Sequence, residues 1–417
     1  MVFGDDTMAD ITTQPAKLKR SVTLPLLTFY GLGTIIGAGI YVLIGEVVGF
    51  AGIYAPISFV LAAIISVFSA FSFAELSSRF PYSAGEAIFV YKGLQQKWLS
   101  TLIGWMVVAT GIISSATLAR GIIGYAQIFI PIPGWLAIIL LALSVGILVV
   151  WGIAESVTVA AITTLIEIGG LLFVIIIAHK SFTTLPARWH ELIPPIHNSQ
   201  IWLGIIMGSF IAFFAFIGYE DMVNIAEEVK KPRRNIPIGI ILAITISTLL
   251  YFLIALVAIL SLPIKELAHH AAPLALIVQK NRPSAVDIIG IISLIAVING
   301  VLIQTIMASR VIYGLATSGS APQFFSKINR KTQTPVYAIV LTIVAILMLA
   351  LWFPIITLAK TTSFIILIIF TFVNLSLIII KRKTPCVENA ACYSIWIPII
   401  GMILCLALLI FGIWVML

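Results

Sequence analysis

Long uncharged stretches constrain the fold of this chain more than any other feature. Apolar runs of about 20 residues, the length that a membrane-spanning helix needs, recur throughout, and only 10% of the 417 residues are charged. A soluble domain carries about 25% charged residues, so this chain could not cover a water-facing surface. We predict an all-α polytopic membrane protein with about eleven transmembrane helices, at 22–46, 52–75, 86–118, 134–153, 156–178, 200–218, 236–261, 286–309, 335–353, 361–380 and 394–417. The long third segment could instead be a tilted or kinked helix.

The basic residues predict how these helices are oriented. With a cytoplasmic N-terminus, fifteen Lys and Arg residues lie on the inner side and seven on the outer side, while Lys92 and Lys97 are not assigned to either side. This distribution follows the positive-inside rule. Membrane topology therefore explains the net charge of +8, and we expect membrane lipid rather than nucleic acid around the protein. An odd number of spans puts Leu417 outside. The polar N-terminus leads directly into a full-length span, so we expect no cleavable signal peptide.

The cysteines and the missing enzyme motifs argue against a disulfide, a metal site and enzymatic activity. Cys386 and Cys392 fall in a loop that the charges place in the reducing cytoplasm, and no CxxC pair occurs, so we expect neither a disulfide nor a metal site. The motifs HExxH, GxSxG and GxxxxGK[ST] are absent. We therefore expect no enzyme, no catalytic residues, no cofactor and no direct use of ATP by this chain.

Glycines weaken the first predicted helix at membrane depth. The segment GLGTIIGAGIYVLIG (31–45) contains five glycines, each of which costs a helix about 1 kcal/mol relative to alanine. A broken helix survives in hydrocarbon only where it lines a cavity or packs in protein. Its free N–H groups suit a carboxylate, and its free carbonyls suit an ammonium group. Close helix packing through small residues is the alternative explanation.

A second candidate break lies five spans later. The sixth span reads FFAFIGYEDMVN (213–224), so two acids follow Gly218 where the helix should still be crossing. Transporters built from inverted repeats carry breaks at equivalent positions of their two halves, near the bilayer midplane. The two glycine-marked positions therefore favour a transporter built from inverted repeats over close helix packing alone.

Four segments resemble the amino acid–polyamine–organocation (APC) superfamily, in particular its bacterial permeases related to cationic amino acid transporters. They are residues 31–45, FAELSSRFPYSAGEAIFVYKG (73–93), FFAFIGYEDMVNIAEEVKKPRRNIPIGI (213–240) and ASRVIYGLATSGSAPQFFSKINRKTQTPVYAI (308–339). The resemblance implies a LeuT-type fold with a cytoplasmic tail (1–21), two inverted repeats (22–178 and 200–380) and an eleventh helix (394–417). It implies a secondary active amino acid permease of the cytoplasmic membrane that works by alternating access. An amino acid exchanger, a channel and a transporter-like sensor remain alternatives.

The resemblance also implies a substrate site made largely of backbone. The substrate carboxylate is expected on N–H groups of the first helix, at Gly37, Ala38 and Gly39, beside Ile35. The amino group is expected on carbonyls of the sixth helix, at Phe214, Ala215 and Ile217. Phe214 also matches an aromatic lid, and Glu220 matches an acid for which gating and structural hydrogen bonding are both open.

Glu167 departs from the family pattern. Proton-coupled relatives carry a lysine at this position of the fifth helix, whereas here a glutamate lies in the middle of the otherwise uncharged span 156–178. An acid at this depth costs about 2.5–3.5 kcal/mol and usually marks an ion or proton path. We hypothesise that Glu167 gains and loses a proton during transport. A permanently protonated structural glutamate is one alternative, and a carboxylate that binds sodium or a cationic group of the substrate is another.

Polar residues elsewhere are weaker candidates. Asn299, Gln304 and Ser309 of the eighth span either face the cavity or bridge helices, at about 1–2 kcal/mol or less per hydrogen bond. Glu86 resembles a family glutamate near the cytoplasmic mouth, where a structural role is favoured.

Overall fold

The computed structural model describes residues 20–416, apart from 82–84, 152–156, 330–331 and 333. Almost all of the predicted tail 1–21 therefore lies outside the described residues. A long helix stands in each predicted span: α1 (Leu24–Ala51), α2 (Ala55–Arg79), α4 (Lys97–Ala126), α5 (Gly134–Trp151), α6 (Val157–Ile177), α8 (Ser199–Phe214), α9 (Pro232–Ser261), α12 (Val286–Thr317), α13 (Val336–Trp352), α14 (Ile355–Lys383) and α15 (Trp396–Met416). The predicted all-α class is confirmed for the described part of the chain.

Length and hydropathy alone support fewer crossings than eleven. Within the described ranges, eight helical stretches are long and apolar enough to cross a membrane, or nine if the bent pair Ala161–Ile177 and His179–Leu192 counts as one span. Two features account for the difference between nine and the predicted eleven. The helices α1 and α2 merge into one stretch, Leu24–Arg79, and α13 has only 17 residues.

The third predicted span, 86–118, is wrong as one continuous helix. The chain forms a short α3 (Gly85–Leu94) and then the long α4. Between them Gln95 has a φ of 57°, a left-handed conformation that ends a helix. The polar residues Gln95, Gln96 and Lys97 lie at this corner. The crossing helix is therefore α4, and it begins after the corner.

Prolines and basic residues mark several helix ends. Pro25, Pro56 and Pro232 lie in the first turns of α1, α2 and α9, where the missing N–H group costs no helical hydrogen bond. The helix α14 ends on three basic residues, 381–383, which suit the negative end of the helix dipole. These residues are consistent with the observed starts of α1, α2 and α9 and with the observed end of α14.

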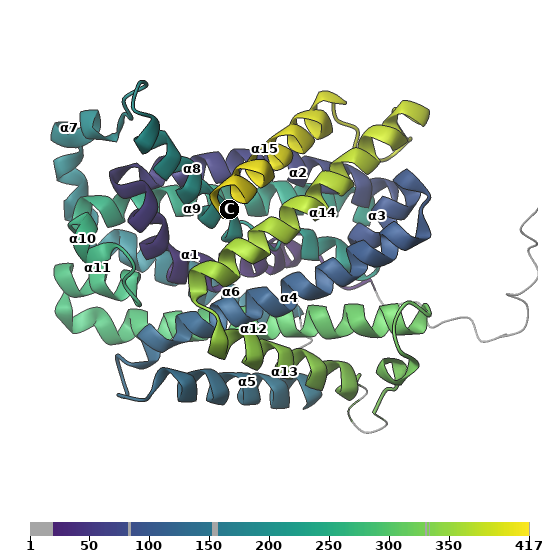
Figure 1. Cartoon of the computed structure of the whole chain (residues 1–417), viewed down its shortest axis with the longest axis horizontal. Helices are drawn as coiled ribbons and strands as arrows, with labels where there is room; N and C mark the ends of the chain where they lie inside the picture. Colours follow the sequence, from purple (N-terminus) through teal and green to yellow (C-terminus); the bar gives the residue numbers. More distant parts are fainter. Residues whose placement is uncertain (1–19, 82–84, 152–156, 330–331, 333, 417) are drawn as a thin grey trace, which may run out of the picture.

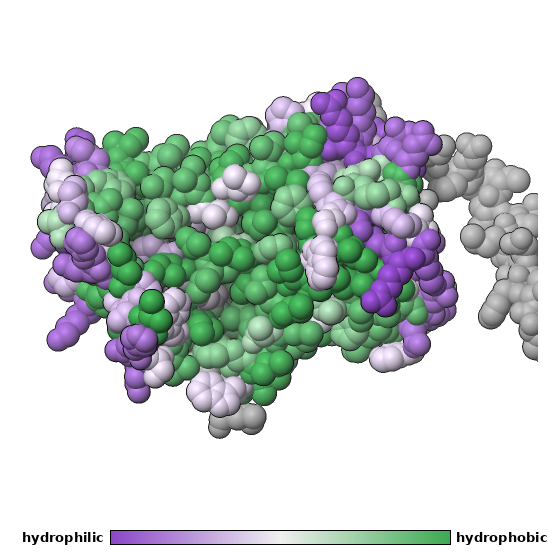
Figure 2. Space-filling view, turned by 90° about the horizontal axis from the view of Figure 1, so that it is seen from above, coloured by the Kyte–Doolittle hydropathy of each residue, from purple (hydrophilic) through white to green (hydrophobic). Residues whose placement is uncertain are grey.

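The long helices run side by side in a bundle (Figure 1). The short helices α3, α10 (Ile264–Leu267) and α11 (Pro273–Asn281) lie towards its ends. Figure 2 shows a face that is apolar through its middle and hydrophilic at both ends. Large apolar side chains on several helices are open to the surroundings; Ile176 of α6 and Ile410 of α15 are 67% and 63% exposed. Such an apolar belt is the surface that a bilayer covers.

Two backbone hydrogen bonds join the start of α1 to a distant segment. Val22 and Val229 form an isolated parallel bridge. The N–H of Val22 donates to the carbonyl of Glu228 at 3.0 Å, and the N–H of Lys230 donates to the carbonyl of Val22 at 2.8 Å. The bridge therefore connects the segment before the first helix to the segment before α9.

The link between α14 and α15, residues 384–395, contains a disulfide, so the prediction that Cys386 and Cys392 form none is wrong. Cys386 and Cys392 form a disulfide there, with their Cα atoms 5.6 Å apart, a separation that a disulfide needs. The prediction rested on the compartment and on the missing CxxC spacing. It failed because the link folds back on itself and brings together two cysteines six positions apart in the chain.

Candidate functional site

The first break lies within α1, at Gly37. Its dihedral angles, φ 1° and ψ −151°, are non-helical, while the residues on both sides continue as helix. Gly37 is buried, and so is Gly39. The predicted interruption of the first helix is therefore present in the glycine segment.

The second break follows α8. This helix ends at Phe214, a turn covers 215–218, and a 3-10 helix, η5 (Tyr219–Glu228), continues the chain. Gly218 has a φ of 132°, and a Cβ atom at this position would lie 2.4 Å from the carbonyl oxygen of Thr34. Only glycine combines this dihedral angle with such a close approach, so Gly218 permits both the turn and its contact with α1.

Side-chain hydrogen bonds fix the two breaks against each other. The hydroxyl of Thr34 donates to the carbonyl of Gly218 at 2.8 Å, and the N–H of Gly218 donates to Oε2 of Glu220 at 2.8 Å. The carboxyl group of Glu220 therefore stabilises the turn. Structural hydrogen bonding was one of the two roles expected for this residue. Its gating role stays a prediction.

The hydroxyl of Tyr251, on α9, bridges both breaks. Its oxygen lies 2.7 Å from the carbonyl oxygen of Ile35 and 2.9 Å from that of Ala215. Because a carbonyl has two lone pairs, the one at Ala215 can still accept a second donor. Tyr251 was not identified from the sequence, where nothing distinguishes it from other aromatic residues of an apolar span.

One cavity lies between the two breaks. Residues from four helices and the turn after α8 line it: Thr34, Ile35, Gly37, Gly39, Ser114, Leu118, Phe214, Ile217, Gly300, Ile303 and Gln304. Five of the seven predicted substrate residues are among them. Ala215 is not among the lining residues but packs against Gly39, where an added Cβ atom would lie 3.0 Å from the Cα of Ala215. Ala38 lies in α1 between the two lining glycines, and its side chain is outside the described part.

The α4 and α12 walls were mostly missed by the sequence analysis. These two helices pack on each other along their length (Figure 1). They contribute Ser114 and Leu118 from α4, and Gly300 and Ile303 from α12. A small or apolar residue in an apolar helix carries no signal of the face on which it lies. Gln304 was one of three α12 residues expected either to face the cavity or to bridge helices, and it is among the lining residues.

A second, acidic cavity adjoins the first. It is lined by Glu86, Val107, Thr110, Ile217, Glu220, Asp221, Gln304, Met307 and Ile366, so Ile217 and Gln304 belong to both cavities. The amide Nε2 of Gln304 donates to Oδ2 of Asp221 at 3.2 Å. Gln304 therefore links the wall of the first cavity to a carboxyl group of the second.

Glu167 lies on α6, outside the lining of both cavities, and its side chain is fully buried. The amide Nδ2 of Asn299 donates to its Oε1 at 2.8 Å, while its Oε2 has no partner among the described residues. Asn299 directly precedes Gly300, which lines the first cavity. The carboxyl group is thus one residue away from the wall, through an α6–α12 hydrogen bond. Ser309 instead donates to its own helix, at the carbonyl of Ile306.

Comparison with known proteins agrees with this architecture. A family model described as amino acid permease matches residues 23–417. The mitochondrial cationic amino acid transporter 3 of Arabidopsis thaliana is 30% identical over 88% of this chain and 63% of its own length. The vacuolar cationic amino acid transporter 2 of the same plant is 32% identical over 88% of this chain and 61% of its length. The chain therefore spans less than two thirds of these plant relatives.

A bacterial relative matches over nearly its whole length. The branched-chain amino acid permease BcaP of Bacillus subtilis (strain 168) is 28% identical over 98% of this chain and 92% of its own length. These relatives are named as transporters and permeases, not as enzymes. The family model and these relatives confirm the resemblance found in the sequence: the chain belongs to the amino acid permease family of the APC superfamily.

Proposed function

We propose that this protein is a secondary active transporter that carries amino acids across the cytoplasmic membrane by alternating access. One observation carries the proposal: the breaks in α1 and after α8 line the same cavity, together with α4 and α12. Breaks in membrane helices are tolerated where they line a cavity, and helix ends there bind ionic ends of a substrate. The names of the relatives favour amino acids as the substrate class.

In this proposal the substrate bridges the two breaks. Its carboxylate binds N–H groups at Gly37, Ala38 and Gly39, and its amino group binds carbonyls at Phe214, Ala215 and Ile217. The α4 and α12 walls surround the side chain of the substrate and select among amino acids. The segments 22–178 and 200–380 act as inverted repeats that open the cavity alternately to either side.

Proton symport through Glu167 is the proposed coupling mechanism. The carboxyl group is fully buried, and its Oε2 has no hydrogen-bond partner among the described residues. A proton can therefore bind to this oxygen without breaking a hydrogen bond from the protein. The link through Asn299 gives the protonation state a contact with the cavity wall. A sodium ion at the same carboxyl group is the competing possibility, and replacing sodium by choline at constant pH tests it.

The transport proposal is tested with purified protein in proteoliposomes. The twenty amino acids are first screened by thermal shift, since a ligand at about 100 times its Kd stabilises the folded protein by about 2.7 kcal/mol. A ligand that binds is then used in counterflow with labelled substrate. Accumulation of label supports a transporter. Binding without counterflow would instead identify a sensor, and counterflow without gradient-driven accumulation would identify an exchanger.

A further inference from the structure

A buried ionic cluster joins the last turns of α2 and α14. Glu75 is fully buried, and its Oε1 accepts hydrogen bonds from Nη2 of Arg79 at 2.5 Å and Nζ of Lys381 at 2.7 Å. Arg79 and Lys381 are themselves only 7% and 5% exposed. Two cations therefore share one carboxylate, so the cluster needs further acceptors to satisfy its donors.

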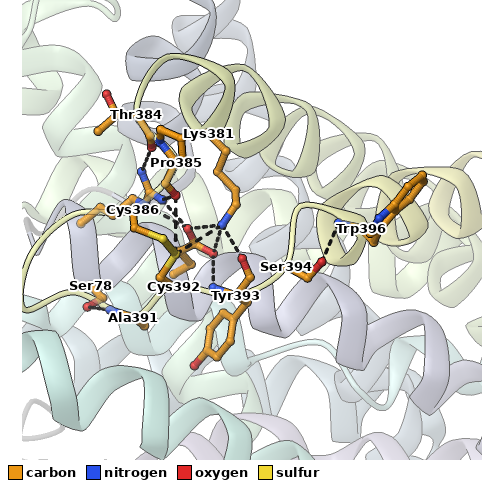
Figure 3. Close-up of polar contacts among 12 residues, drawn as sticks. Ser78, Lys381, Thr384, Pro385, Cys386, Ala391, Cys392, Tyr393, Ser394 and Trp396 are labelled. Carbon is orange, nitrogen blue, oxygen red and sulfur yellow. Dashed lines mark hydrogen bonds and ion pairs between the residues drawn. A yellow bond between two sulfur atoms is a disulfide. The ribbon is translucent and has the colours of Figure 1, made fainter.

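The link between α14 and α15 supplies those acceptors. Arg79 donates to the carbonyls of Thr384, at 2.7 Å, and Pro385, at 2.5 Å. Lys381 donates to the carbonyl of Tyr393 at 2.6 Å, and the N–H of Tyr393 donates to Glu75 at 3.0 Å. Figure 3 shows these contacts converging on the cluster from the two ends of the link.

The disulfide lies between these two points of contact. Cys386 follows Pro385, and Cys392 precedes Tyr393, so the bond closes the link where it meets the cluster (Figure 3). Both cysteines are exposed, and exposed disulfides are the more readily reduced ones. The ammonium group of Lys381 lies 4.0 Å from Sγ of Cys392, where it stabilises negative charge on that sulfur when the bond breaks.

The basic run 381–383 at the end of α14 directly precedes the link and predicts a cytoplasmic location for it. Disulfides in that compartment are commonly transient, catalytic or redox-sensing. We propose that Cys386 and Cys392 form a reversible thiol–disulfide site that exchanges with low-molecular-weight thiols, and that the disulfide holds the link on the cluster of Glu75, Arg79 and Lys381.

The oxidant in this exchange is a small disulfide such as glutathione disulfide. One cysteine thiolate attacks it, which forms a mixed disulfide and releases one small thiolate. The second cysteine thiolate then attacks the protein sulfur of the mixed disulfide and releases the other. Two protein sulfurs are oxidised and one small disulfide is reduced, and the two protons of the cysteines end on the released thiols. Reduction of the link is the reverse reaction.

Purified full-length protein tests this inference without any transport measurement. The protein is equilibrated with mixtures of reduced and oxidised glutathione, its free thiols are trapped in the folded protein by a large excess of a maleimide at neutral pH, and the protein is weighed intact. We expect two labels to appear reversibly as the reduced share rises, and none on Cys405, which is fully buried. The Tm should fall by about 2–4 °C on reduction, because an opened short loop gains chain entropy.

Three variants act as controls. Cys405→Ser should keep the full response, whereas Cys386→Ser and Cys392→Ser should each lose the redox dependence of the Tm. A disulfide that persists under a large excess of reduced glutathione, or an equal Tm in the two redox states, would overturn the inference. Labelling of the reduced pair by an impermeant maleimide only from the outer side of the membrane would do so as well.

Discussion

Gly39 offers the sharpest test of the cavity between the two breaks. A Cβ atom on Gly39 would lie 3.0 Å from Cα and 3.3 Å from Cβ of Ala215, so even alanine must push the two breaks apart. Overpacking of this kind costs about 1–3 kcal/mol. If that cost is paid on substrate binding, the affinity falls about 5- to 140-fold, at 1.4 kcal/mol for each tenfold.

Gly39→Ala should therefore weaken binding within that range, and Gly39→Val, with two further methyl groups beside Phe214, should abolish uptake. The stability of the empty protein should change less, because alanine also returns about 1 kcal/mol of helix propensity. Kd values come from thermal shift against ligand concentration, and rates come from counterflow at equal amounts of protein in the vesicles.

Gly314→Ala is the matched control on α12. No atom lies within 4 Å of its added Cβ, so uptake should be unchanged and the Tm equal or higher. Uptake by Gly39→Val within twofold of the wild type would show that the two breaks do not form the substrate site.

Four further outcomes are expected. Glu167→Gln should keep exchange of labelled substrate but lose accumulation driven by an imposed proton gradient; wild-type accumulation would assign coupling to another group. Tyr251→Phe removes the hydroxyl shared by both breaks, and should lower stability by about 1–3 kcal/mol in thermal unfolding and counterflow several-fold. Glu75→Gln leaves two buried cations with a neutral amide and should cost about 3–5 kcal/mol, whereas the exposed Glu191→Gln should cost at most about 1 kcal/mol; equal Tm values would contradict this. A tag after Leu417 should be cleaved by protease added to intact cells, and protection would mean that the span count or the orientation is wrong.

The sequence could predict the breaks because their cause is local. Glycines at 37 and 218 weaken a helix wherever they occur, and in lipid a weakened helix needs a cavity or a packed neighbour. A kink in the third segment was left open, but its position at Gln95 was not predicted, because a left-handed residue other than glycine leaves little trace in an apolar profile. Most helix limits were therefore predictable within a few residues, but the limits of α4 and the end of α12 were not.

The walls of the cavity could not be predicted in the same way. Whether Ser114 or Leu118 faces inward depends on the rotation of α4 against α12, and helices that are apolar on all sides do not encode that rotation in a hydrophobic pattern. The disulfide between Cys386 and Cys392 was missed for a related reason. It depends on how the link folds over Glu75, which is 306 positions from Lys381 in the chain.

The bridge between Val22 and Val229 provides two backbone amides whose hydrogen exchange reports on motion at this end of the protein. The amide hydrogens of Val22 and Lys230 are held by bonds between the same two segments, so they can exchange with deuterium only when those segments separate or fray. If α1 and the chain after η5 move as one body during transport, both amides stay protected whatever the substrate does. If they part, both exchange in step, and the rate of deuterium uptake counts how often that end opens.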